Sequence, residues 1–269
     1  DVKRASYMKQ KSLTKISHFD RYTVRTNLDT KPKDWLTFGV RQSIAYTDRL
    51  ADGYTNTDRA NSTTNSVVAS YFYPTYWDPT TEGDQPHQFW GFDMFDIYWL
   101  AELQPMKMND IVYNGTAYAQ ITPVKGLTLK SQLALNAFDT RSTQTILPSF
   151  PGNNGLGQSS ESHSRSSMWT ITNTAEYKFK IADKHSFTLL AGQEGIKYSS
   201  NGFTAMGKGT SDDRLPTLGN VTAGEIPGYT SSKYEYLSFF GRVDYNFNDK
   251  YYLNFTIRND QSSRFGANN

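Results

Sequence analysis

Residues 234–260 read YEYLSFFGRVDYNFNDKYYLNFTIRND, and this stretch decides the class of fold. From residue 237 to residue 247 every second residue is apolar except Gly241, and the apolar positions are Leu237, Phe239, Val243, Tyr245 and Phe247. After the polar residues 248–250, the same period returns at Leu253, Phe255 and Ile257. A period of two is typical of a β-strand with one apolar face, and a short polar connection predicts a hairpin. The stretch therefore predicts two antiparallel strands.

The same alternation recurs along the chain, most clearly over residues 127–138, where the odd positions are mostly apolar. We expect eight strands, at 18–30, 35–48, 109–122, 127–141, 166–181, 186–199, 233–247 and 251–264. Asn173 and Gln193 interrupt the apolar face of the fifth and sixth strands.

Composition supports an all-β chain. Aromatic residues make up 14% of the 269 residues, while the hydrophobic fraction is only 37%. No run approaches about 18 consecutive apolar residues, which excludes a helical membrane protein. A net charge of +2 gives no basic surface for nucleic acid, and the absence of cysteine excludes disulfides and thiolate metal sites.

The connections between the expected strands alternate strictly between short and long. Tight turns are expected at 32–34, 123–126, 183–185 and 248–250, and stretches of about 60, 25 and 33 residues separate the hairpins. Outer-membrane barrels have short periplasmic turns and long extracellular loops, whereas a soluble β-sandwich has mixed loop lengths at both ends. Aromatic residues also lie near strand ends, as a membrane girdle requires: Trp35, Tyr46, Trp169, Tyr177, Phe179, Tyr251 and Tyr252. The pattern predicts a transmembrane antiparallel β-barrel segment in the outer membrane.

The long connection at about 49–108 is the stretch where we expect function. It combines aromatic rings with carboxylates, which suit sugar rings or peptide side chains by stacking and hydrogen bonding. The candidates for substrate or partner contact are Tyr76, Trp77, Asp78, Trp90, Asp93, Asp96 and Trp99. The alternative is that these rings pack loop against loop, or against a partner protein.

The sequence shows no catalytic or cofactor motif. Residues 202–208 begin like a phosphate-binding loop, but Gly209 stands where that motif needs Ser or Thr. The four histidines lack metal-ligand spacing, and there is no nucleophile elbow. We therefore predict no enzyme activity, no cofactor and no metal.

The last hairpin closely resembles a signature of the SusC/RagA family of TonB-dependent outer-membrane transporters. That family has an FFGRVNY strand leading to an RDGSSRFG motif, and this chain has FFGRVDY at 239–245 and RNDQSSRFG at 258–266. Gln261 departs from the pattern, because the family usually has Gly there. Residues 21–29, RYTVRTNLD, followed by Trp35 and Leu36, resemble a second hairpin of the family. The two motifs flank nearly the whole chain.

The resemblance implies a 22-stranded barrel filled by an N-terminal plug domain. It also implies a SusD-like surface lipoprotein that caps the barrel, and energy from TonB–ExbB–ExbD through the plug. The substrate would be an oligosaccharide or an oligopeptide, and lipid would surround the barrel. Residues 1–269 would be a partial barrel domain without the plug, since the chain opens on Asp1 and stops in what reads as a loop.

Four charged residues in the last hairpin would then face the lumen: Arg242, Asp244, Arg258 and Asp260. They would line the substrate path or contact the plug, or else form a cross-strand lattice of charges that holds the wall together.

Two other functions remain open on the sequence. One is a passive porin-like barrel. The other is a soluble β-sandwich, either a carbohydrate-binding module or a glycan hydrolase. A hydrolase would need a pair of carboxylates across a cleft, and the sequence gives no sign of one.

Overall fold

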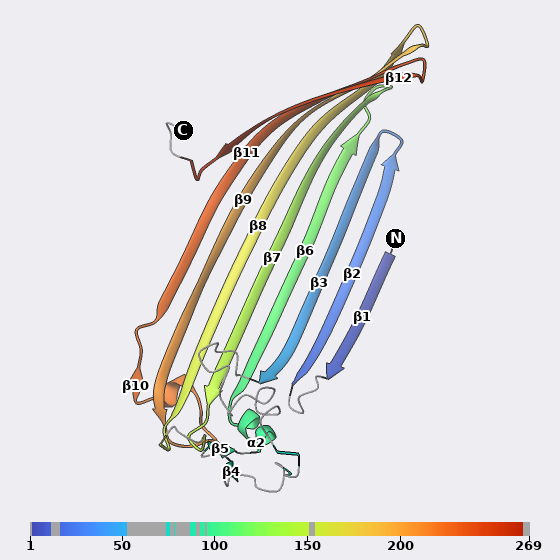
Figure 1. The fold of residues 1–269 in the computed structure, drawn as a ribbon. Helices are drawn as coiled ribbons and strands as arrows, with labels where there is room; N and C mark the ends of the chain where they lie inside the picture. The colour runs from blue at the N-terminus through green and yellow to red at the C-terminus, as the bar shows by residue number, and fades with distance from the viewer. Residues whose placement is uncertain are drawn as a thin grey trace.

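The computed structural model describes residues 2–11, 17–52, 74–75, 78, 87–89, 92–94, 96–150 and 154–265. The described chain forms one long, curved antiparallel sheet of ten strands (Figure 1). The main strands pair in the order in which they follow one another in the sequence, so the topology is a simple up-and-down meander. This is the architecture expected of a stretch of barrel wall.

The main strands are β1 (Val2–Lys11), β2 (His18–Lys33), β3 (Leu36–Asp52), β6 (Pro105–Ile121), β7 (Leu127–Ile146), β8 (Gly157–Ile181), β9 (His185–Thr210), β11 (Gly228–Phe247) and β12 (Tyr251–Ser262). The short β10 (Ala223–Gly224) pairs with β9. A separate hairpin consists of β4 (His87–Phe89) and β5 (Phe92–Met94), and the helix α2 (Ile97–Glu102) follows it. A 3-10 turn, η2, spans Leu218–Asn220.

All eight expected strands are present, and the structure adds β1 at the start of the sheet. The sequence analysis missed β1 because Val2–Lys11 is rich in lysine and polar residues, so its apolar positions show no clear period. Its pairing with β2 reveals the pattern, since Tyr7 lies opposite Tyr22 and their rings stack at 4.8 Å.

The strands are longer than expected at one end of the sheet. β8 and β9 have 25 and 26 residues. The second and third long connections therefore shrink to 147–156 and 211–227, instead of about 25 and 33 residues. The added length in β8, around 158–168, is mostly polar on both faces, so alternation of hydrophobicity could not reveal it.

The two ends of the sheet differ as the sequence predicts. Short turns lie at one end, while α2, β4, β5 and β10 all lie at the other (Figure 1). The connection between β3 and β6 spans 53–104 and carries elements of its own, which corrects the expected bounds of 49–108. The first predicted turn also moves, because β2 continues through Pro32 and Lys33.

Two turns show why their residues are needed. Asn248 and Asp249 have φ values of 53° and 55°, the left-handed pair that a tight hairpin requires and that Asn and Asp tolerate. Gly126 has a φ of +87°, and a Cβ there would lie 2.2 Å from the carbonyl oxygen of Lys178. Because that oxygen belongs to the backbone, only glycine fits at this position.

The strand register places the alternating residues on two distinct faces. Leu133, Ile171, Gly195 and Leu237 lie side by side across β7, β8, β9 and β11, and we call the face that carries them the apolar face. Leu133 is 45% exposed and Leu237 is 37% exposed, although both belong to this apolar row. In the described ranges the main strands form one sheet, with only the β4–β5 hairpin apart from it, and this differs from the two packed sheets of a β-sandwich.

Aromatic residues form two bands on the apolar face. Near the short turns, Tyr177, Phe179, Phe187 and Tyr245 stack across three strands with ring centroids 4.8–5.2 Å apart. Toward the loops, Tyr7, Tyr22 and Tyr46 form a second stack. Two aromatic girdles around an apolar belt are typical of transmembrane β-barrels.

The structure moves Tyr252 to the other face of the sheet and confirms that Asn173 and Gln193 lie on the apolar face. Tyr252 lies opposite Asn246 on the other, polar face, so it does not belong to the girdle. Asn173 and Gln193 do lie on the apolar face, where the amide nitrogen of Asn173 donates to the oxygen of Gln193 at 2.9 Å.

Candidate functional site

The loop end of the sheet contains a small hydrophobic core of its own. Leu100, Leu103 and Phe150 are buried there, and Trp99 and Leu147 pack against them. These residues come from α2 and from the connection between β7 and β8. Two connections that are distant in the sequence are thus joined by burial of apolar side chains.

Hydrogen bonds reinforce this core. The Asp96 carboxylate accepts from the backbone N–H of Tyr98 at 2.9 Å and caps the N-terminus of α2. The backbone N–H of Leu147 donates to the carbonyl of Leu103 at 2.9 Å, which ties the β7–β8 connection to the end of the helix.

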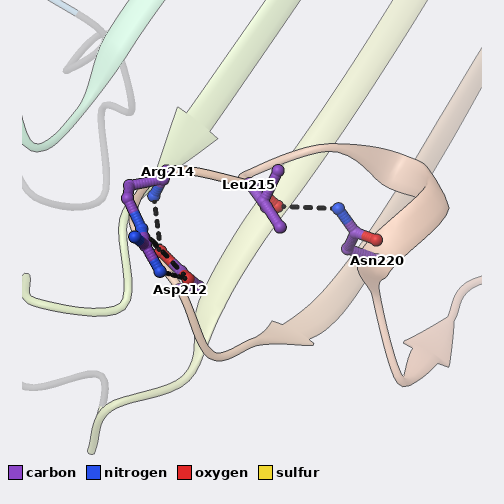
Figure 2. A network of polar contacts seen from close by, with 4 residues as sticks. All are labelled: Asp212, Arg214, Leu215 and Asn220. Carbon is purple, nitrogen blue, oxygen red and sulfur yellow. Dashed lines mark hydrogen bonds and ion pairs between the residues drawn. The ribbon is translucent and has the colours of Figure 1, made fainter.

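An ion pair and a hydrogen bond from a side chain to the backbone order the β9–β11 connection (Figure 2). The Arg214 guanidinium donates to both carboxylate oxygens of Asp212, at 2.7 Å from Nη2 and 3.0 Å from Nε. The side-chain amide of Asn220 donates to the carbonyl of Leu215 at 3.1 Å. Asp213 accepts from the backbone N–H of Ser149 at 3.0 Å, so this connection also joins the β7–β8 connection.

The Asp212–Arg214 pair gives the loop a dependence on pH. The Arg214 side chain and its backbone N–H both donate to Asp212 and lower the pKa of that carboxyl below its usual 3.8. A depressed pKa means that the pair stabilises the loop above pH 3.8 and is lost only as the pH falls through the lower, folded value. We expect pepsin to cleave near Leu215 slowly at about pH 4 and faster at lower pH.

The matched variants are Asp212→Asn and Glu225→Gln, which each remove one carboxylate from the same connection. Asp212→Asn should be cleaved rapidly already at about pH 4, whereas Glu225→Gln should follow the parent. Identical cleavage profiles for all three proteins would show that the ion pair does not order the loop.

The structure places the predicted contact residues in different settings. Trp99 packs against the loop core and Asp96 caps α2, which supports the packing alternative for these two. Asp78 is exposed, and Asp93 lies in β5 opposite Gln88. Tyr76, Trp77 and Trp90 lie outside the described residues. Contact of any of the seven with a substrate or partner stays a prediction.

Three apolar side chains between the end of β9 and the start of β11 are strongly exposed. Ile226 is 96% exposed, Tyr229 is 71% exposed and Leu215 is 55% exposed. The chain bulges between β10 and β11. The backbone N–H of Glu225 donates to the carbonyl of Met206, and the pairing of β11 with β9 begins only at Gly228, opposite Thr204. The sequence analysis did not find this surface, although Ile226-Pro227-Gly228 within a polar connection was a usable signal.

The four charged residues predicted for the lumen all lie on the polar face. Arg258 donates to Asp260 at 2.7 Å, to Glu194 at 2.9 Å and to Ser238 at 3.0 Å. Arg242 and Asp244 form a second pair, with Nε and Oδ2 2.9 Å apart. Arg258 thus joins three neighbouring strands, as the lattice interpretation predicts; their role in a substrate path stays untested.

The described residues hold no cluster of three or more His, Asp or Glu side chains suited to a metal ion. No helix within these same ranges is long and apolar enough to cross a bilayer.

Comparison with known proteins shows which receptors the chain resembles. No family model matches the chain. Two TonB-dependent receptors of Formosa agariphila, P26 and P3, are 24% and 23% identical over 98% of this chain. A structure of the RagAB peptide transporter superposes on 98% of the chain with a TM-score of 0.85 and 33% identity. The RagAB peptide importer in its open-open state matches with a TM-score of 0.83 at 32% identity. Over nearly its whole length the chain is therefore similar to TonB-dependent receptors and to the RagAB transporter.

These similarities place the protein in the outer membrane. The chain spans 26% and 27% of the lengths of the two receptors and 30% of the RagAB chain. A more distant match, the ferric preacinetobactin receptor BauA from Acinetobacter baumannii, has a TM-score of 0.55 at 12% identity and shares the fold alone. The resemblance drawn from the two hairpin motifs is therefore confirmed.

Proposed function

We propose that this chain forms part of the wall of a TonB-dependent importer. The loop end of the sheet, with its three connections, would form part of the mouth of that importer. The observation that carries the proposal is the loop end of the sheet. Three connections are joined there by a buried core and by hydrogen bonds between them. An ordered entrance above a lipid-embedded wall suits capture of a solute, and a passive pore would not need it.

We infer that the substrate is an oligopeptide and not an oligosaccharide. The support is the 33% identity to a protein described as a peptide transporter. The segment would bind and guide its substrate without breaking a bond in it. Residues 1–269 would then be one part of a barrel domain, with the plug and the coupling to TonB–ExbB–ExbD supplied by other parts of the receptor.

The two faces of the sheet have separate roles in this proposal. The apolar face lies against lipid, because its rows are apolar and its two ends carry aromatic bands. The polar face lines the interior, where Arg258 and its partners hold the wall and present charge to the substrate path.

A SusD-like lipoprotein is the partner that we propose for the exposed apolar surface at Leu215, Ile226 and Tyr229. An exposed apolar patch on an ordered loop usually marks an interface. Truncating the central residue of such a patch often costs about 2 kcal/mol of binding free energy or more, which is roughly thirtyfold in affinity.

The test is Ile226→Asp in the full-length receptor, with Val124→Asp as its control. Val124 is 58% exposed in the turn at the opposite end of the sheet, so the same chemical change is made away from the mouth. We expect Ile226→Asp to reduce both co-purification of the lipoprotein and uptake of a labelled oligopeptide mixture, with barrel levels unchanged. Val124→Asp should retain both.

The uptake assay also decides between substrate classes. Uptake of labelled oligosaccharides instead of peptides would overturn the peptide assignment while leaving the importer proposal intact. Wild-type co-purification and uptake by Ile226→Asp would show that the exposed surface has no role in capture.

A further inference from the structure

The apolar face contains a groove that crosses β7, β8, β9 and β11. Its floor is Gly195, with Ile171 beside it on β8 and Leu237 beside it on β11. Leu133 and Trp169 add to the apolar lining, and the groove has a volume of about 760 Å³. The polar residues 261–263 also line it, with Gln261 opposite Leu237. This is a concave, mostly apolar site on the surface that we place against lipid.

The groove exists because Gly195 has no side chain. Neighbouring strands are about 4.8 Å apart, so the missing side chain leaves a gap roughly 10 Å wide between Ile171 and Leu237. A Cβ at Gly195 would lie 3.2 Å from Cγ2 of Ile171, so alanine would fit after a small shift and a larger side chain would fill the groove. In the next row toward the short turns, the amide pair of Asn173 and Gln193 ends the apolar floor.

Charged residues lie at the other end of the groove. Lys197 is opposite Trp169 on one side and Glu235 on the other, and its ammonium is 2.9 Å from the Glu235 carboxylate. Lys233 lies two residues further along β11 on the same face and is exposed. This end of the groove therefore carries two lysines and one glutamate on one face, and Lys197 has three donors, more than Glu235 needs.

Depth in the membrane identifies the kind of molecule that matches this arrangement. Tryptophan is enriched at the level of lipid headgroups, so Trp169 marks the boundary and Lys197 lies at or just above it. The loop end of an outer-membrane barrel is extracellular, so the groove opens toward the outer leaflet.

We propose that the groove binds one acyl chain of an outer-leaflet lipid whose headgroup is phosphorylated. The chain lies over Gly195 between Ile171 and Leu237, and the phosphate accepts hydrogen bonds from Lys197 and attracts Lys233. The groove is continuous with the lipid-facing surface, which favours a lipid over a soluble ligand. The site is separate from the mouth and does not depend on the imported substrate.

The test uses the full-length receptor, purified from outer membranes and stripped of lipid in mild detergent. Native mass spectrometry then measures binding of a bis-phosphorylated, multiply acylated glucosamine disaccharide and of its dephosphorylated counterpart. We expect the parent receptor to prefer the phosphorylated lipid. Gly195→Leu should lower the occupancy of both lipids about tenfold, the loss expected when roughly two methylene groups lose their contacts. Lys197→Gln should remove the preference for phosphate.

Ala119→Leu is the matched control, because Ala119 lies on the same face, opposite Phe38 and Ser131 and away from the groove. It should bind lipid like the parent. Gly195→Ala replaces Gly195→Leu if the larger side chain prevents assembly of a heat-modifiable barrel, and it should lower occupancy less. Parent-like occupancy in the Gly195 variant, or equal binding of the two lipids by the parent, would overturn the proposal.

Discussion

Leu133→Arg should destabilise the folded barrel by about 2–4 kcal/mol, the cost of a cationic side chain near the middle of a lipid-facing strand. Leu133 lies between Ala117 on β6 and Ile171 on β8, in the apolar belt between the two aromatic bands. No acidic residue lies beside it in that row, so the new charge would have no partner. The measurement is the fraction of heat-modifiable, folded receptor in the outer membrane and its unfolding midpoint in urea.

Gln132→Arg is the control, because it introduces the same side chain one residue away. Gln132 lies opposite Tyr118 and Thr172 on the polar face, where charged residues such as Lys130 are already accommodated. We expect a loss well below that of Leu133→Arg. Equal losses from the two substitutions would contradict the assignment of the faces.

Leu100→Ala should loosen the mouth without affecting the wall. The Leu100 side chain is only 1% exposed in the centre of the loop core, and truncating a buried leucine costs about 2–5 kcal/mol. Because this core joins α2 to the β7–β8 connection, its loss should expose residues 96–104 to protease. Limited proteolysis of intact cells measures this directly, and uptake should fall with it.

Leu156→Ala provides the comparison, since Leu156 is 53% exposed in the β7–β8 connection and shares no buried contact with the core. Its digestion pattern and uptake should match those of the parent. Folded receptor levels should be unchanged in both variants. If Leu100→Ala resists protease as well as the parent does, α2 and the β7–β8 connection are held together by something other than this core.

The wall of the sheet could be predicted from the sequence because lipid imposes a period of two on it. Rows such as Leu133, Ile171 and Leu237 need apolar side chains on one face, and the turns need residues such as Gly126 and Asn248. Strand residues that lack this apolar period of two could not be predicted from the sequence. The loop-side half of β8 is mostly polar on both faces and β1 is rich in lysine and polar residues, so neither shows a clear alternation.

The mouth could be predicted only in part. The sequence marked an aromatic connection, but a ring that packs and a ring that binds have the same letter. Trp99 packs in the loop core together with Phe150, which is distant in the sequence and comes from another connection. Such a cluster depends on tertiary contacts that no local pattern encodes, and so does the exposure of Ile226.

The length of β8 sets the distance between the entrance and the charged surface of the membrane. Its stretch from Gly157 to Trp169 lies beyond the aromatic band, and at about 3.3 Å per residue and a tilt near 40° it rises roughly 30 Å. Electrostatic screening at physiological salt acts over about 8 Å, so more than three screening lengths separate the entrance from the lipid phosphates. An incoming solute at that height is shielded from the negative charge of the cell surface. In the proposed importer, selection between anionic and cationic cargo would therefore fall to the loops themselves.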